Sequence, residues 1–210
     1  MSMAKIQFSS EESNLVQHPD LILTKNRIIF KLCEAFGKLG LEMEKEWKKH
    51  EFSSGHLWNM HKISRGENFQ GLPYIVLDFP REFGKDDILA IRTLFWWGNY
   101  FSITLQLKGK YKQLFEGRLE KNVGLLLKHD FLISISENEW AHQVNEEHYE
   151  HLSGFKEDEI NNILRSRPFL KLVRKIGLDQ WQEATDILWA NFQILLRAME
   201  PNFPGGGKDL

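Results

Sequence analysis

Two extended runs separated by a turn dominate the pattern of apolar and polar positions, in residues 88–107, ILAIRTLFWWGNYFSITLQL. A Gly98-Asn99 pair between runs of β-branched and aromatic residues is typical of a tight β-hairpin. In the second run, Phe101, Ile103 and Leu105 alternate with polar residues. Because successive side chains of a strand point to opposite faces, one sheet face is expected to be buried and the other polar. A site on the sheet should lie on the polar face or at its edges.

Apolar residues recur at three- and four-residue steps on either side of this region and predict helices. The first helix is expected over residues 24–49, capped by Thr24, and the last over 179–199, starting at Asp179. Short helices are predicted at 156–165 and 168–175. Residues 110–130 form either a helix from about 114 to 128 or further strands.

Further strands are predicted at residues 56–63, 74–79 and 131–136. A loop through Gly66 and Gly71 should follow the first of these, and Pro80 should end the second. The order of helix, antiparallel strands and helices favours an α+β fold, with the sheet packed against an N-terminal helix and a C-terminal helical segment. We expect an irregular segment over 1–20, one domain over 21–200 and a flexible tail over 201–210.

The composition adds mainly exclusions. The chain has 210 residues, 42% of them apolar, which suits one domain with a sizeable core. Its 27 basic and 29 acidic residues give a net charge of −2, so we expect no nucleic-acid partner. The single cysteine, Cys33, has no partner for a disulfide within the chain. Neither a signal peptide nor an apolar run near the ~20 residues of a spanning helix is evident, so we expect no membrane partner and a cytoplasmic location.

Six polar and aromatic residues form the candidate ligand site. Asp78 and Arg92 are charged residues within apolar strands, and turn formers and rings surround them. An arginine beside an aspartate is either a structural ion pair or an anchor for a carboxylate or phosphate. Trp96 belongs to the same side of its strand as Arg92, which favours an exposed platform or, alternatively, cross-strand packing. The candidate ligand-binding residues are Arg65, Tyr74, Asp78, Arg92, Trp96 and Tyr100.

A histidine-rich string, HQVNEEHYEH, is the candidate metal site. If residues 145–152 are helical, His148 and His151 share a face, and His142 precedes them. Imidazole and carboxylate groups suit zinc or another divalent metal. The alternative is a solvated connector between the sheet and the C-terminal helices. His56, Trp58 and His61 are interpreted as residues of an ordinary edge strand.

Basic residues between Lys108 and Lys121 alternate with Tyr111 and Phe115. Basic and aromatic side chains together are the composition of surfaces that bind single-stranded nucleic acid. Glu116 and Glu120 interrupt the stretch, so a solvated helix or strand face is the preferred interpretation.

The strings GENFQGLPYIVLDFPR and AIRTLFWWGNYFSITLQLKG resemble signature segments of a bacterial family of conserved proteins without an assigned activity. The resemblance covers roughly residues 55–110 and implies no catalytic residue and no cofactor. We therefore expect a non-enzymatic module that binds a small molecule or a protein, a second copy of the chain included, on the polar and aromatic face of the sheet. The alternative is a hydrolase or other metal-dependent enzyme that uses the His/Glu cluster.

Overall fold

A seven-stranded sheet in the order β1-β2-β3-β4-β7-β5-β6 forms the centre of the computed structural model, which describes residues 5–53 and 60–201. All paired neighbours are antiparallel. The strands are β1 (Lys62–Phe69), β2 (Leu72–Phe83), β3 (Ile88–Trp96), β4 (Tyr100–Lys108), β5 (Leu132–Ser134), β6 (Tyr149–His151) and β7 (Phe169–Gly177). The helices are α1 (Ser10–Gln17), α2 (Pro19–Trp47), α3 (Lys110–Lys121), α4 (Val123–Lys128), α5 (Glu157–Ser166) and α6 (Ala184–Ala198).

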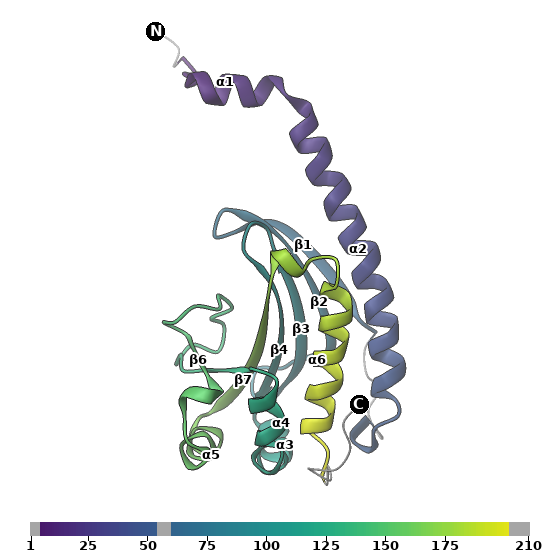
Figure 1. Cartoon of the computed structure of the whole chain (residues 1–210), viewed down its shortest axis with the longest axis vertical. Coiled ribbons are helices and arrows are strands. Elements are labelled where there is room, and N and C mark those ends of the chain that lie inside the picture. Colours follow the sequence, from purple (N-terminus) through teal and green to yellow (C-terminus); the bar gives the residue numbers. More distant parts are fainter. Residues whose placement is uncertain (1–4, 54–59, 202–210) are drawn as a thin grey trace.

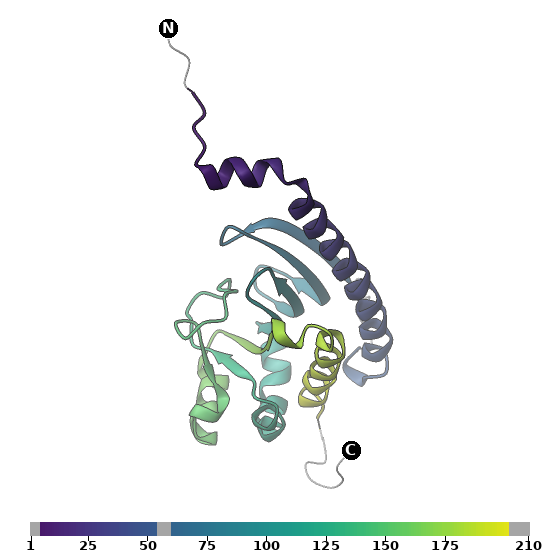
Figure 2. The same ribbon diagram turned by 45° about the horizontal axis from the view of Figure 1, so that its top comes forward.

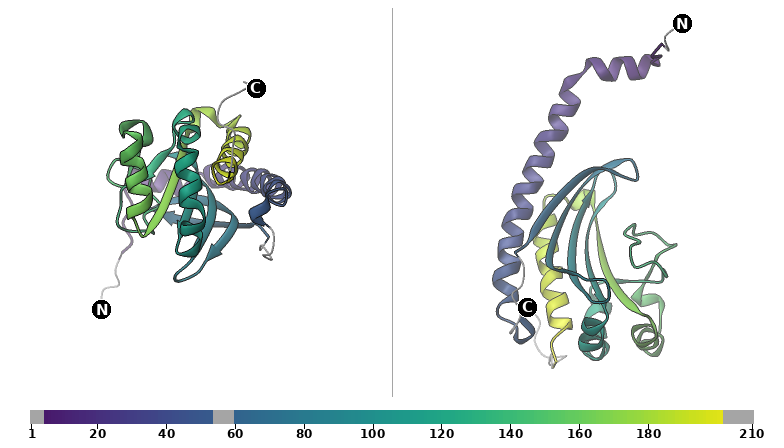
Figure 3. Two further views of the ribbon diagram at one scale, coloured as in Figure 1. Left: turned by 90° about the horizontal axis from the view of Figure 1, so that it is seen from below. Right: turned by 180° about the vertical axis from the view of Figure 1, so that it is seen from behind.

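The helices α2, α3, α5 and α6 lie side by side on one face of the sheet (Figure 1; Figure 3, left). The main core fills the space between them and contains Phe36, Phe101, Phe115 and Phe192, all fully buried. A smaller cluster on the opposite sheet face includes Trp96, Tyr100 and Tyr149. This arrangement confirms the predicted α+β fold with helices against one face.

The predicted hairpin is confirmed. β3 and β4 pair in a continuous antiparallel register, with Phe95 opposite Phe101 and Trp96 opposite Tyr100. Gly98 adopts a φ of +71°, a left-handed conformation that glycine takes without steric cost. The Asn99 side chain donates to the Trp97 carbonyl at 2.8 Å and closes the turn.

Two strands are longer than their turn formers suggested. β1 continues from Lys62 to Phe69 through Gly66, where we expected a loop. The Tyr74 ring lies against Gly66, and a Cβ there would meet it at 2.5 Å. β2 continues past Pro80 to Phe83, and a register shift between Asp78 and Arg81 accommodates the proline, which cannot donate to the sheet. His56 and Trp58 lie outside the described residues.

The predicted helix over residues 168–175 is wrong. These residues belong to β7, which pairs with β4 along its whole length, from Lys108 opposite Phe169 to Tyr100 opposite Gly177. Leu170 and Leu172 belong to the main core on the helix side. They alternate with Lys171 and Val173, and this two-residue period identifies a strand.

Residues 10–17 and 19–20 are helical where irregular chain was predicted. Ser9 and Glu12 form a capping box, in which each side chain accepts a hydrogen bond from the backbone N–H of the other residue, and α1 follows. α2 starts at Pro19, because proline suits the first helical turn, so Thr24 is an interior residue and not the cap. The last helix is also shifted: residues 178–180 form a 3₁₀ turn, and Glu183, not Asp179, occupies the N-cap position of α6, without a capping hydrogen bond from its side chain. None of the helices in the described ranges is long and apolar enough to cross a membrane.

Candidate functional site

The Asp78–Arg92 pair is the centre of the predicted site. The two residues are direct cross-strand neighbours on β2 and β3. Arg92 donates from Nε to Oδ1 at 2.7 Å and from Nη2 to Oδ2 at 2.9 Å, a bidentate ion pair. The Asp78 side chain is 9% exposed and that of Arg92 is 26% exposed. A carboxylate this deeply placed is stable because the guanidinium compensates its charge.

His142 completes the surroundings of Arg92. Arg92 Nη1 lies 3.3 Å from His142 Nε2, and since a guanidinium can only donate, Nε2 accepts and the imidazole is neutral. Burial, together with the charges of Lys171 and Arg92, lowers the pKa of His142 to about 3. The guanidinium carbon of Arg92 lies over the Phe83 ring, 5.3 Å from the ring centre, so the two groups form a cation–π contact. Arg92 is therefore fixed by three neighbours of different chemistry.

Lys171 is the residue of this site that the sequence analysis missed. It is 1% exposed, donates to the Ala141 carbonyl and lies 5.7 Å from the centre of the Tyr149 ring. Burial and the nearby Arg92 charge lower the pKa of Lys171 to about 7, although Glu139 acts in the opposite direction. Its alternation with Leu170 and Leu172 is the signal that would have placed it on the polar side of a strand. We call the sheet face that carries Asp78, Arg92, Gln106, Lys108 and Lys171 the charged face, after its four charged residues.

Residues 135–148, the cover segment, lie over the charged face and contain neither helix nor strand. Sheet side chains hold their backbone: Gln106 donates to the Glu139 carbonyl at 3.2 Å, and the Tyr100 hydroxyl accepts from Val144 N–H at 2.8 Å. Lys108 pairs with Glu139 at 2.9 Å. The C-terminal helix α6 packs on the other face of the sheet, and the cover segment lies on the face that carries the predicted site (Figure 2).

The aromatic residues of the predicted site are part of a packed cluster. Trp96 is 4% exposed, its indole N–H donates to the Phe69 carbonyl at 3.0 Å, and its ring contacts those of Phe69 and Tyr100. The exposed platform expected at Trp96 is therefore wrong, and cross-strand packing describes this residue. Tyr74 joins the same cluster. Trp97 faces the main core and packs against Phe95.

Arg65 is separated from the rest of the predicted site. Its register partner is Ile75, a main-core residue, whereas the partners of Asp78 are Lys62 and Arg92. Arg65 therefore belongs to the helix side of β1, where its charge acts on the Cys33 thiol of α2. Burial raises the pKa of that thiol more than Arg65 lowers it.

The three candidate metal ligands are not brought together. Residues 149–151 form β6 instead of a helix, so the helical spacing of His148 and His151 is lost. His151 contacts Asp130 at 2.9 Å, whereas His142 lies beside Arg92. Within residues 5–53 and 60–201, no three histidine, cysteine or acidic side chains are placed to hold a metal ion.

The basic and aromatic side chains of α3 do not lie together on one exposed surface. Tyr111 and Phe115 are buried in the main core, and Lys112 is buried against Glu116. The preferred interpretation of a solvated face holds only for the outermost lysines of α3.

A second surface, which the sequence analysis did not single out, lies on the N-terminal helices. The first buried residue of α2 is Ile29, and the preceding residues 5–28, the N-terminal arm, extend beyond the edge of the sheet (Figure 1; Figure 3, right). One contact to the sheet is an ion pair of 2.8 Å between Lys25 and Glu67 on β1. Exposed large apolar side chains of α1, α2 and the residues before them are Ile6, Phe8, Leu15, Val16, Leu21, Ile22, Leu23, Phe30 and Leu41.

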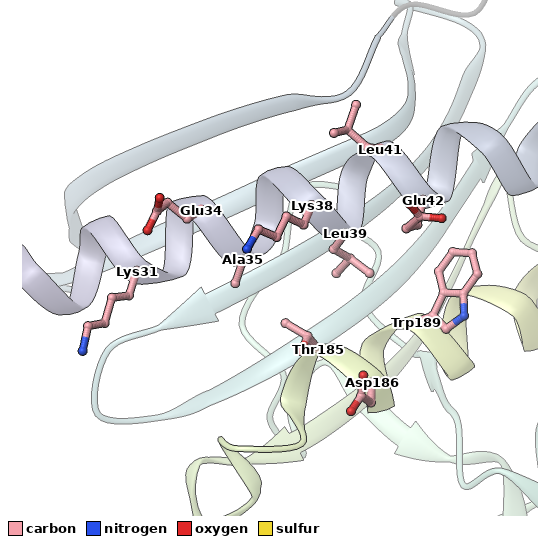
Figure 4. A pocket seen from close by; sticks show the side chains of 10 residues that line it. All are labelled: Lys31, Glu34, Ala35, Lys38, Leu39, Leu41, Glu42, Thr185, Asp186 and Trp189. Carbon is pink, nitrogen blue, oxygen red and sulfur yellow. The ribbon is translucent and has the colours of Figure 1, made fainter.

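Hollows follow the same helix. One of about 570 Å³ is lined by Leu23, Arg27, Phe30 and Glu34, among others. A groove of about 760 Å³ continues from Lys31 and Glu34 along α2 and is bounded by Thr185, Asp186 and Trp189 on α6. Figure 4 shows these α6 side chains beneath α2. The surface from Leu23 to Trp189 is thus continuous along one side of the molecule.

No family model, curated protein or solved structure matches this chain. The resemblance over residues 55–110 stays a prediction, and the function has to be argued from the two surfaces themselves.

Proposed function

We propose that this protein is a non-enzymatic binding module that associates with a second copy of itself through the N-terminal arm and the exposed face of α2 next to it. The observation that carries the proposal is the uncovered apolar surface of the arm. Contiguous exposed apolar side chains are costly in water and mark interaction sites. In the arm, apolar residues face several directions: Ile22 continues the core face of α2, whereas Leu23 points elsewhere on the helix. A helix that is apolar on several faces is typically buried in an assembly.

The charges of the arm and of the next two turns of α2 support a second copy as the partner. Acidic Asp20 precedes basic Lys25, Arg27 and Lys31, and Glu34 follows them, so both signs are interspersed with the apolar residues. A surface that carries both signs can be complementary to itself, as a two-fold symmetric interface requires. A partner of one strong charge would leave part of this surface unpaired.

Light scattering coupled to size-exclusion chromatography tests the proposal. The wild-type chain of 24.8 kDa should elute at twice this mass at micromolar concentration, and the double variant Leu23→Ser/Phe30→Ser at the monomer mass. Leu114→Ser is the matched control, because Leu114 on α3 is 47% exposed and Leu23 51%. This control should remain a dimer. A wild-type protein that is monomeric at every concentration tested would refute the proposal.

A second candidate function, binding of a carboxylate or phosphate at the charged face, is supported by an excess of positive charge. Arg92, Lys108 and Lys171 face two carboxylates, those of Asp78 and Glu139, and Arg92 and Lys108 keep a quarter of their side-chain surface exposed. An anion would relieve the repulsion that lowers the pKa of Lys171.

Thermal unfolding with inorganic phosphate tests this candidate. Millimolar phosphate should raise the melting temperature of the wild type and not that of Lys171→Met. Equal shifts with phosphate and with chloride at the same ionic strength would contradict the candidate, because they would indicate screening and not a site.

A further inference from the structure

The exposed residues of α2 include a stripe whose charges are arranged symmetrically about its centre. At 3.6 residues per turn, Leu23, Arg27, Phe30 and Glu34 fall within an arc of about 60°. We call these four residues the outer stripe. The arc lies on the far side of α2 from Phe36 and Met43, which are in the main core. Phe30, at 62% exposure, occupies the middle, with a cation three residues before it and an anion four residues after it.

Building on the proposed function, we infer that two copies pair through their outer stripes as antiparallel helices, with the two-fold axis between Phe30 and Lys31. In an antiparallel pair, the numbers of opposing residues have a constant sum. An axis at this point places Arg27 of each copy opposite Glu34 of the other, so two identical ion pairs flank the central phenylalanines. A parallel pair in register would instead place like charges opposite each other.

The hydrogen bonds of these side chains are compatible with such pairing. Arg27 Nη2 donates to Thr24 Oγ1 at 2.7 Å on the surface of its own helix. Glu34 lines both hollows along α2, next to Lys31. The central part of the stripe therefore combines an apolar contact with two charged groups, which is the composition of a specific helix–helix interface.

The same register gives the groove between α2 and α6 an occupant. Counting outward from the axis, residues 19–26 of one copy lie opposite residues 35–42 of the other. The first turns of α2, with the exposed Leu23, then lie along the side of the groove that Lys38 and Leu41 line (Figure 4). One arrangement thus covers the outer stripe and the part of the groove that α2 lines.

Charge exchange tests the antiparallel register. Arg27→Glu should weaken dimerisation at least tenfold, because the introduced carboxylate then faces Glu34 of the other copy, and Glu34→Arg should do the same with two arginines. An equimolar mixture of the two variants should restore a dimer that contains one copy of each. In this mixed dimer, one contact joins a native glutamate to a native arginine, and the other joins the introduced glutamate to the introduced arginine, so both contacts pair opposite charges. Native mass spectrometry with one variant tagged identifies this mixed dimer. Lys121→Glu, an equal change of charge on α3, should leave the wild-type dimer unchanged.

The outcomes separate the two proposals. A monomeric wild type overturns the proposed function and with it the register. If the wild type is dimeric and Leu23→Ser/Phe30→Ser is monomeric, but the two charge variants stay dimeric or fail to combine in the mixture, the arm is the interface and the antiparallel register is wrong. Circular dichroism of each variant confirms that the helix content is retained. The double variant Arg27→Glu/Glu34→Arg provides a second measurement, because it should form its own dimer.

Discussion

Apolar side chains are usually buried and charged ones exposed, and two regions depart from this rule: the N-terminal arm exposes apolar residues, and the charged face buries charged ones. On the arm, large apolar residues such as Leu23 lie in water, whereas on the charged face Asp78 and Lys171 are buried. The buried charges have partners within the chain: a bidentate arginine for Asp78, and a carbonyl and an aromatic ring for Lys171. The exposed apolar residues of the arm, from Ile6 to Leu23, have no comparable cover in the described part of the chain. An unusual residue that is satisfied internally indicates a structural role, and one that is not indicates a missing partner.

On the charged face, the largest effect should come from breaking the buried ion pair. Arg92→Leu leaves the Asp78 carboxylate buried without its cation and should lower the free energy of unfolding by about 3 kcal/mol, measured by urea denaturation at pH 7. Asp78→Leu/Arg92→Leu removes both charges and should recover a large part of this loss.

The control for this prediction is Glu67→Ala, which breaks the exposed pair with Lys25. That change should cost less than about 1 kcal/mol, because solvent screens exposed ion pairs. Equal losses for Arg92→Leu and Glu67→Ala would show that the charged face is not a buried cluster.

The next effect concerns the pH dependence of stability at Lys171. Its pKa is about 7 in the folded chain and about 10.5 in the unfolded chain. Between these values the unfolded chain binds one more proton, so the free energy of unfolding should rise with pH by up to about 1.4 kcal/mol per unit. Below pH 7 both states are charged, and the cost of burying the charge is fully present.

Lys171→Met should remove this contribution. The difference in unfolding free energy between variant and wild type, measured in urea at pH 7, 8 and 9, should therefore shrink as the pH rises. A difference that is constant with pH would mean that Lys171 stays fully charged and hydrated in the folded protein. Lys121→Met, on the exposed end of α3, serves as the control.

These buried charges also show what could be predicted from the sequence. The hairpin was predictable because its signal is local: a turn pair between two strands with clear alternation. Asp78 and Arg92 stand out in the sequence as charged residues within apolar strands, but their adjacency depends on the register between β2 and β3. β7 was mistaken for a helix because Lys171 and Lys175 interrupt its apolar pattern, and its position depends on pairing with β4, which is distant in sequence. The burial of Trp96 depends on Phe69 and on the cover segment, which no local pattern specifies.

The arm illustrates the opposite error. Its residues 1–20 were expected to be irregular, because a polar stretch with few apolar residues gives a weak periodic signal. The capping box at Ser9 and Glu12 was the local signal of a helix start. The consequence of α1 and α2 together, an exposed apolar surface beyond the sheet, depends on where the domain ends and is visible only in three dimensions.

An effect of comparable size per pH unit, in the acid range, is expected at His142. Its pKa is about 3 when folded and about 6.5 when unfolded, so between these values the unfolded chain again binds more protons. Stability should fall as the pH is lowered from 6.5 towards 3, and His142→Gln should flatten this acid limb. His151→Gln, an exposed histidine paired with Asp130, is the control. If both variants change the acid limb equally, His142 is not held neutral by the charged face.

The smallest effect on folding is expected for Leu23→Ala. Its comparison with Leu39→Ala, a substitution in the same helix, tests directly whether the exposed side of α2 contributes to the stability of the monomer. Leu39 is 6% exposed on the core side of α2, and Leu23 is 51% exposed on the outer stripe. Leu23→Ala should change the stability of the monomer by less than about 0.5 kcal/mol. Leu39→Ala, the buried reference, should lower the free energy of unfolding by about 2–5 kcal/mol at any protein concentration, because it leaves a cavity in the core.

The concentration dependence separates the two leucines further. The wild type should become more stable as its concentration rises, because association stabilises the folded state, and Leu23→Ala should lose much of this dependence while Leu39→Ala keeps it. The measurement is thermal unfolding over a wide range of protein concentration. If Leu23→Ala instead lowers stability as much as Leu39→Ala at the lowest concentration, the outer stripe packs within its own chain, and the arm needs no partner.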